Sequence, residues 1–137
     1  MNRFTNFFLK NCVSKLSPLK YGLNPSDINA SFVNNNRPIK ILNGNPSYIN
    51  MLDSLYGYNL VLDIKKDLNK CASASYKHNS PAGVSFDNNI YDSLYNARNC
   101  DSLSSFGDFI AVNEKIDKKT ALYLKKEVSD GIIAPDY

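Results

Sequence analysis

The segment from Asn45 to Leu68 constrains the fold more than any other part of the 137-residue chain. Asn45 or Ser47 is suited to cap the start of a helix there, and Pro46 is suited to its first turn. The apolar residues of the segment recur at helical spacing, at Ile49, Leu52, Tyr56 and Leu60, with Leu55 and Leu62 beside them. The pattern therefore predicts a helix that runs to about Leu68.

Shorter segments on both sides alternate between strand and helix patterns. Residues 27–37 are typical of a loop, and Pro38–Leu42 is a strand candidate closed by the turn signal Asn43-Gly44. The later expected elements are a strand at Cys71–Tyr76, a helix at Ile90–Ala97, a strand at Asp108–Val112, a helix from Asp117 to Val128 and a strand at Ile132–Ala134. We expect Ser80–Gly83 (SPAG) to end the first of these strands, and Gly131 to stop the last helix. The alternation predicts an α/β domain with a layered mixed sheet and flanking helices.

Positive charge is concentrated at the start of the chain. The first acidic residue is Asp27, whereas the rest of the chain is nearly neutral within an overall charge of +3. The basic residues before it are Arg3, Lys10, Lys15 and Lys20. A nearly neutral body argues against nucleic acid as a partner, and no run is long and apolar enough to span a membrane. We expect residues 1–18 to be a basic leader or linker of a cytoplasmic protein, with mitochondrial targeting by the leader as the alternative.

The cysteines argue against both a disulfide framework and a metal site. There are three, Cys12, Cys71 and Cys100, and they are widely spaced with no C-x-x-C pair. An odd number at such spacing favours a reducing compartment, and we expect no bound metal.

The only histidine, His78, follows Lys77 directly and precedes the SPAG run. Adjacent residues on a strand point to opposite faces, so the pair can serve one substrate only if the backbone turns there. A neighbouring ammonium favours a neutral imidazole that can act as a general base, and a lysine can stabilise a developing oxyanion. On the residues alone, a surface pair with no role stays open as the commoner alternative.

Two later positions are candidate ligand contacts. Gly107 lies in an expected loop at residues 104–107, where a glycine lets a ligand approach the backbone closely. Asp130 is expected at a helix C-terminus, where a carboxylate opposes the helix dipole. Such local conflicts are enriched at functional sites. The alternatives are an ordinary turn for Gly107 and an ordinary helix-terminal residue for Asp130.

Five blocks in order carry a family resemblance. They are LKYGLNP at Leu19–Pro25, LNGNPSYINMLDSL at Leu42–Leu55, ASYKHNSPAG at Ala74–Gly83, SSFGDFIA at Ser104–Ala111 and EVSDGIIAP at Glu127–Pro135. With these blocks the chain resembles the AICAR transformylase (phosphoribosylaminoimidazolecarboxamide formyltransferase) domains of bifunctional purine biosynthesis proteins, which also carry IMP cyclohydrolase. Residues 19–137 are then expected to be the first subdomain of such a domain.

The resemblance implies transfer of a formyl group from 10-formyltetrahydrofolate to the 5-amino group of AICAR, giving FAICAR on the way to IMP. It implies that His78 assists proton removal from the amine, and that Lys77 stabilises the oxyanion or aids departure of the folate nitrogen. The residues that it implies for nucleotide binding are Lys20, Tyr21, Gly22, Gly107 and Asp130. It also implies a cytidine-deaminase-like fold, repeated twice in a complete domain, and homodimers with sites between subunits.

Several positions depart from the family pattern. Lys20 stands where the family has an arginine, so the charge is kept and the planar fork is lost. Ser26 and Asp27 replace a His-Gln pair. We expect the second transformylase subdomain, with most of the folate site, and the cyclohydrolase domain to be missing from this chain, and the isolated chain therefore to be inactive or very feeble. An inactive remnant or split-gene subunit that binds an AICAR-like nucleotide or a partner chain is therefore the alternative. A nucleoside deaminase is excluded, because the H-x-E and P-C-x-x-C zinc motifs are missing.

Overall fold

The computed structural model describes residues 16–33 and 39–137, which belong to two units divided between Tyr48 and Ile49. In the N-terminal unit, β1 (Leu16–Pro18) pairs antiparallel with β2 (Ser31–Val33), a segment that we expected to be loop. The strand expected at Pro38–Leu42 is wrong for residues 39–42, which are irregular, with Leu42 60% exposed. An exposed segment that pairs with no described strand gains nothing from extended structure. Pro38 and the first fifteen residues of the expected leader lie outside the described residues.

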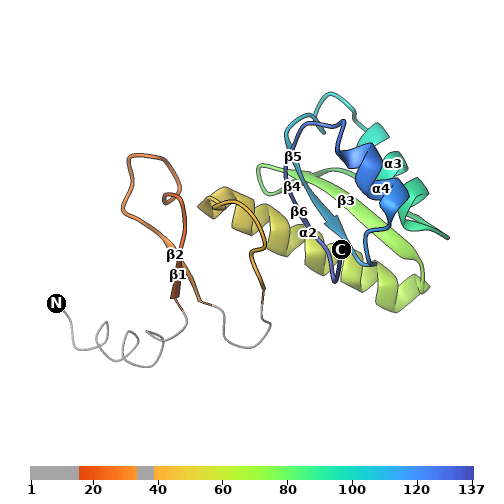
Figure 1. Ribbon diagram of the computed structural model, residues 1–137, viewed down its shortest axis with the longest axis horizontal. Helices are drawn as coiled ribbons and strands as arrows, with labels where there is room; N and C mark the ends of the chain where they lie inside the picture. Colours follow the sequence, from red (N-terminus) through yellow and green to blue (C-terminus); the bar gives the residue numbers. More distant parts are fainter. Residues whose placement is uncertain (1–15, 34–38) are drawn as a thin grey trace. The chain divides into compact units, whose positions relative to one another are not determined.

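The C-terminal unit is a four-stranded mixed sheet with the order β4-β3-β5-β6 (Figure 1). Its strands are β3 (Cys71–Lys77), β4 (Ser80–Asp87), β5 (Asp108–Val112) and β6 (Ser129–Ile133). β3 is antiparallel to β4 and β5, whereas β5 and β6 are parallel. The helices are α2 (Tyr48–Leu68), α3 (Ile90–Asn99) and α4 (Lys118–Leu124). The predicted layered α/β fold is confirmed.

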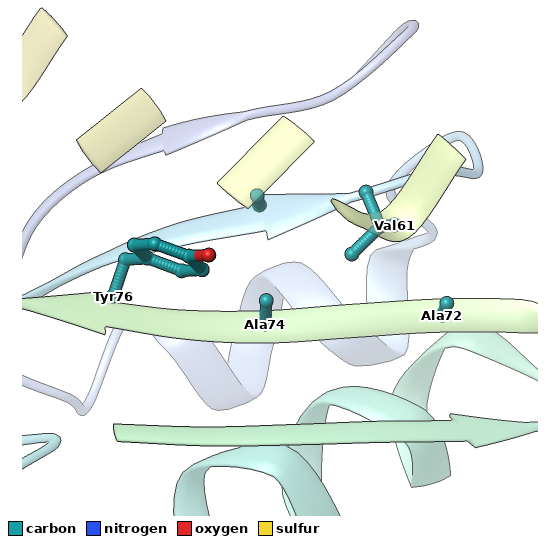
Figure 2. Packing of buried hydrophobic residues seen from close by; sticks show 5 residues of the cluster. Val61, Ala72, Ala74 and Tyr76 are labelled. Atoms are coloured by element: carbon teal, nitrogen blue, oxygen red, sulfur yellow. The ribbon is translucent and has the colours of Figure 1, made fainter. Parts of the chain in front are cut away.

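The helices cover the two faces of this sheet separately (Figure 1). Figure 2 shows Ala72, Ala74 and Tyr76 of β3 on the side of the strand that Val61 of α2 faces. On the opposite face, Leu94 of α3 packs with residues of β5 and with the segment before α4. In the described part of the chain, no helix combines the length and the apolar character needed to cross a membrane.

The SPAG run does not end a strand, as the sequence led us to expect; it begins β4. β4 lies at the edge of the sheet, where a proline that lacks an N–H group breaks no ladder. Gly83 is required by packing, because a Cβ there would lie 2.0 Å from the Ala97 carbonyl oxygen of α3. Pro81 and Gly83, which usually interrupt strands, are therefore both compatible with β4.

α4 is shorter than predicted, and Gly131 does not stop it. Asp117 caps its start as expected, accepting a hydrogen bond from the Thr120 N–H at 2.7 Å, but the helix ends at Leu124. The chain then leaves the helix because other elements bind it: the Val128 carbonyl accepts hydrogen bonds from Gly107 and Arg98. Gly131 and Asp130 consequently lie in β6, so the argument that Asp130 opposes a helix dipole is wrong.

Candidate functional site

Lys77, His78 and Asn79 form a sharp turn between β3 and β4, which we call the hairpin tip (residues 77–79). Lys77 pairs with Ser80, so only His78 and Asn79 connect the strands. Both have left-handed backbones, with φ of 54° and 62°. Two-residue hairpin loops require such angles, which match the twist of the flanking strands. The sequence argument required a turn at the Lys77-His78 pair, and the structure has one directly after Lys77.

The Lys77 ammonium is directed at the loop before β5. Its Nζ donates to the Phe106 carbonyl oxygen at 2.6 Å, across 29 residues of sequence. Gly107, the next residue, has a φ of +73°, and a Cβ there would have the Lys77 Nζ at 3.9 Å as its nearest neighbour. The glycine thus leaves its backbone open beside the ammonium.

Asp130 lies on β6, the strand next to β5. The pairing of Asp108 with Ser129 and of Phe109 with Gly131 places Asp130 opposite an irregularity at the start of β5. The Asn50 amide of α2 donates to its Oδ2 at 3.2 Å. Asp130 is close enough to act electrostatically on Asp53 of α2, as does His78. Gly107 and Asp130 are therefore brought to the same end of the sheet as the hairpin tip.

Asp53 of α2 supports the hairpin tip. This residue is only 4% exposed, and its Oδ1 accepts a hydrogen bond from the Asn79 N–H at 2.7 Å. Burial raises the pKa of the Asp53 carboxyl above its ordinary value. Hydrogen bonds from the Asn79 and His78 N–H groups and the charge of His78 lower that pKa, and the Asp130 carboxylate raises it.

A buried polar network, which we call the Arg98 network, fixes the loop that carries Gly107. Arg98 of α3 donates to both carboxylate oxygens of Asp108, at 3.0 and 3.3 Å. It also donates to the Ser105 carbonyl at 2.8 Å and the Val128 carbonyl at 3.1 Å. The remaining members are Glu127, which pairs with Arg98, and Ser75, which donates to Asp108. Because the two carbonyls belong to the segments before β5 and β6, one guanidinium positions both candidate ligand contacts.

Lys20, Tyr21 and Gly22 belong to the N-terminal unit, and their geometry is described within it. The Lys20 ammonium lies 5.7 Å from the centre of the Tyr21 ring, and the Lys20 N–H donates to the Pro46 carbonyl at 3.0 Å. Gly22 must be a glycine, since a Cβ would lie 2.6 Å from the Ile28 carbonyl oxygen. Asp27 accepts a hydrogen bond from the Asn24 N–H at 2.8 Å and so closes the turn after this stretch.

Chemically, the hairpin tip offers a base next to a cation. The His78 side chain is exposed, and Lys77 is half-buried. Within the described residues Lys77 forms no ion pair, so its charge is compensated only by a neutral carbonyl. An ammonium in this state can stabilise negative charge that develops on a bound group. No group of three or more His, Cys, Asp or Glu side chains in the described ranges is arranged to hold a metal ion.

The sequence reasoning missed the residues that support the site. Asp53 and Asn50 lie one turn apart on α2, both directed at the hairpin tip or β6. The signal that could have revealed Asp53 is a carboxylate on a helix turn with buried neighbours, Met51 and Ser54. Arg98 is a basic residue in the last turn of α3 and is only 4% exposed, and no sequence pattern singled it out.

Comparison with known proteins supports the family resemblance. The sequence profile of the AICARFT/IMPCHase bienzyme family matches residues 2–137. In Prochlorococcus marinus, proteins named bifunctional purine biosynthesis protein PurH are similar to this chain. The identity is 34% over 134 residues for strain MIT 9515 and 32% over 132 residues for strain AS9601. Each of these matches covers 89% of the chain and 26% of the relative. The PurH of Caldicellulosiruptor saccharolyticus is 36% identical over 91 residues, which is 66% of the chain and 17% of that protein. The chain thus spans about a quarter or less of the length of these relatives.

Proposed function

We propose that this chain, which belongs to the AICARFT/IMPCHase bienzyme family, supplies the nucleotide side of a formyl-transfer site in purine biosynthesis. The reaction would move the formyl group of 10-formyltetrahydrofolate to the 5-amino group of AICAR. The observation that carries the proposal is the hairpin tip, where the Lys77 ammonium lies against the Gly107 loop and His78 follows Lys77 in the turn.

In the proposed reaction, the amine nitrogen of AICAR attacks the formyl carbon. A new N–C bond forms, and the bond from that carbon to the folate nitrogen breaks. His78 takes the proton that the amine loses, since the amine is conjugated to the ring carboxamide and is a poor nucleophile. Lys77 stabilises the oxyanion of the tetrahedral intermediate or aids departure of the folate nitrogen.

Each unit contains candidates for nucleotide contacts. We assign contacts to Gly107 and Asp130 in the C-terminal unit, where an open backbone and a carboxylate can meet donors and acceptors of the ligand. Lys20, Tyr21 and Gly22 are the candidates in the N-terminal unit. Lys20 would contact the nucleotide as a point charge rather than as a planar fork, which predicts weaker binding than an arginine would give.

The folate side of the site, a homodimer and a cytoplasmic location are parts of the same proposal. The chain covers only 26% of the length of the Prochlorococcus marinus relatives. These parts of the proposal therefore rest on membership of the family. The location is tested by fusing residues 1–18 to a reporter protein. We expect the fusion to remain in the cytosol, and import into mitochondria would contradict that location.

The catalytic assignment is tested in a chimera, with this chain in place of the matching segment of the Prochlorococcus marinus MIT 9515 protein. We expect the chimera to formylate AICAR, and His78→Ala to lower kcat by roughly 10²–10⁴-fold. Lys77→Ala should lower kcat by about 10²–10³-fold. The matched control is Lys66→Ala, on the exposed side of α2, which should leave the rate unchanged.

Unchanged rates for Lys77→Ala and His78→Ala would refute the assignment. A chimera without activity, together with nucleotide binding by the isolated chain, would instead support the alternative of a non-catalytic binding subunit. For the isolated 137-residue chain we expect little or no turnover, and robust turnover would contradict the view that it holds only part of the site.

A further inference from the structure

We propose that Asp53 is a positioning residue of this site, whose buried carboxylate holds the His78–Asn79 turn in the conformation that presents the imidazole. The inference rests on the proposed function, because it gives the turn a substrate to serve. It concerns a residue of α2 that touches the backbone of the hairpin tip and would not touch the substrate.

The hydrogen bonds define what Asp53 does. Its Oδ1 accepts from the Asn79 N–H at 2.7 Å, and the His78 N–H is close enough to the carboxylate to lower its pKa. Both successive N–H groups of the turn therefore face one side chain. Asp53 lies in the second turn of α2, a helix of 21 residues that packs against β3 through Val61 and Gly57. The acceptor is thus fixed by a rigid element and not by the turn itself.

The turn needs such support because neither of its central residues is a glycine. His78 and Asn79 both have positive φ. Positive φ is unfavourable for an L-residue, less so for asparagine, whose side chain can hydrogen-bond locally. Hydrogen bonds to a charged acceptor are stronger than those between neutral groups, and they offset the cost of these backbone angles. Without the carboxylate, the His78 backbone would relax and carry its imidazole with it.

The charges around the Asp53 carboxylate distinguish a positioning role from one that only stabilises the fold. The charged groups that act on Asp53 are His78 in the hairpin tip and Asp130 on β6, and burial together with Asp53 raises the pKa of Tyr76 on β3. Burial is the largest influence and raises the pKa of the Asp53 carboxyl, so the charged form is disfavoured in the folded chain. A neutral amide of the same shape would cost the fold less, but it would accept weaker hydrogen bonds and hold the turn less firmly. The charge is therefore a cost to stability, of the kind that functional sites retain.

The matched pair of variants is Asp53→Asn and Asp63→Asn. Both replace a carboxylate of α2 with its isosteric amide, and Asp63 lies on the exposed side of the helix. Because His78 is the only histidine, its ring resonances are unambiguous in NMR spectra of the 137-residue chain. We expect Asp53→Asn to shift the Asn79 amide and the His78 ring resonances without lowering the free energy of unfolding at neutral pH. Asp63→Asn should change none of these.

Kinetics in the chimera provide the second readout. We expect Asp53→Asn to lower kcat by about ten- to a hundredfold, because small misplacements of a catalytic group are costly, while KM for AICAR changes less than about twofold. A kcat within twofold of the unsubstituted chimera would overturn the proposal, and so would unchanged Asn79 and His78 resonances. If the unsubstituted chimera does not formylate AICAR, the proposed function fails. The NMR comparison then still decides whether Asp53 holds the turn.

Discussion

The two faces of β3 differ in the chemistry of their side chains. Ala72 and Ala74 point toward α2 and pack against Val61 with no polar partner (Figure 2). Ser73 and Ser75 point the other way, and their hydroxyls bond to groups of α3, β5 and the loop between them. All four are fully buried. One strand thus has a dry alanine face, which sets how closely α2 approaches, and a serine face, which ties down the segments that carry the candidate site.

The two faces of β3 predict which substitutions lower the free energy of unfolding on each side of the strand. The alanine face has no room, so added volume should destabilise it. The serine face depends on complete pairing, so a lost partner should destabilise it more, above all where a charge is left buried. The following predictions test this division.

The largest effect is expected for Asp108→Ala. Arg98 would keep its charge in a site where its side chain is 5% exposed, with its main counterion gone. Removing one member of a buried ion pair costs about 3–5 kcal/mol. Urea unfolding measures the change, with Glu127→Ala as the comparison, since Glu127 is 34% exposed and its loss should cost clearly less. Equal costs for the two variants would contradict the account of the Arg98 network.

Gly57→Ala adds volume to the side of α2 that packs against the alanine face of β3. The new Cβ would lie 2.9 Å from the Ala111 Cβ and 3.1 Å from the Tyr76 ring. Overpacking costs roughly 1–3 kcal/mol, whereas alanine gains up to about 1 kcal/mol of helix propensity over glycine. We therefore expect a net loss of about 1 kcal/mol in the free energy of unfolding. Asn59→Ala, on the exposed side of α2, should show the propensity gain alone, and a stabilised Gly57→Ala variant would refute close packing here.

Ser73→Ala makes the serine face more like the alanine face. It removes the hydroxyl that lies 2.8 Å from the Ser93 hydroxyl, while Ser93 keeps the Ser85 carbonyl at 3.2 Å as an acceptor. A single neutral hydrogen bond contributes about 1 kcal/mol, so we expect a loss of that size. A double-mutant cycle with Ser93→Ala measures the coupling, and additive effects would show that the two hydroxyls do not support each other.

The smallest effect is a pH dependence that comes from Asp53. Its pKa is raised in the folded chain, mainly by burial. The corresponding stability is fully present below the ordinary carboxyl pKa, and it is lost as the pH rises through the raised pKa of the folded state. Asp53→Asn lacks this loss, so the unfolding free energy of the variant relative to the original chain should increase between acid and neutral pH. A difference that is flat with pH would contradict the raised pKa.

Much of the fold was predictable from local pattern, because the central elements follow simple periodicities. α3 has apolar residues at helical spacing, and β5 is a short apolar run. The helix α2 was predicted correctly, but its buried residues, Met51, Asp53, Ser54, Gly57 and Val61, are not the apolar positions that predicted it. β4 was not predictable, because Pro81 and Gly83 act as breakers in most settings. Their acceptance depends on an edge position and on the approach of α3, neither of which local sequence records.

The residues of the candidate site likewise include some that could be predicted from local sequence and some that could not. Lys77, His78, Gly107 and Asp130 could be proposed from the sequence blocks, although Asp130 was placed on the wrong kind of element. The residues that support them could not be predicted, since Asp53 contacts Asn79 across 26 residues of sequence and Asn50 contacts Asp130 across 80. Such pairs exist only once α2 has packed on the sheet.

The hairpin tip, the Gly107 loop and β6 are proposed to form one nucleotide site. NMR titration of the isotopically labelled 137-residue chain with the AICAR nucleotide shows whether they do. We expect the His78 ring and the amides of Asn79, Gly107 and Asp130 to shift together along one saturable curve, and Asp130→Asn to weaken that binding. Shifts that are absent, or that occur in elements away from these residues, would contradict the account.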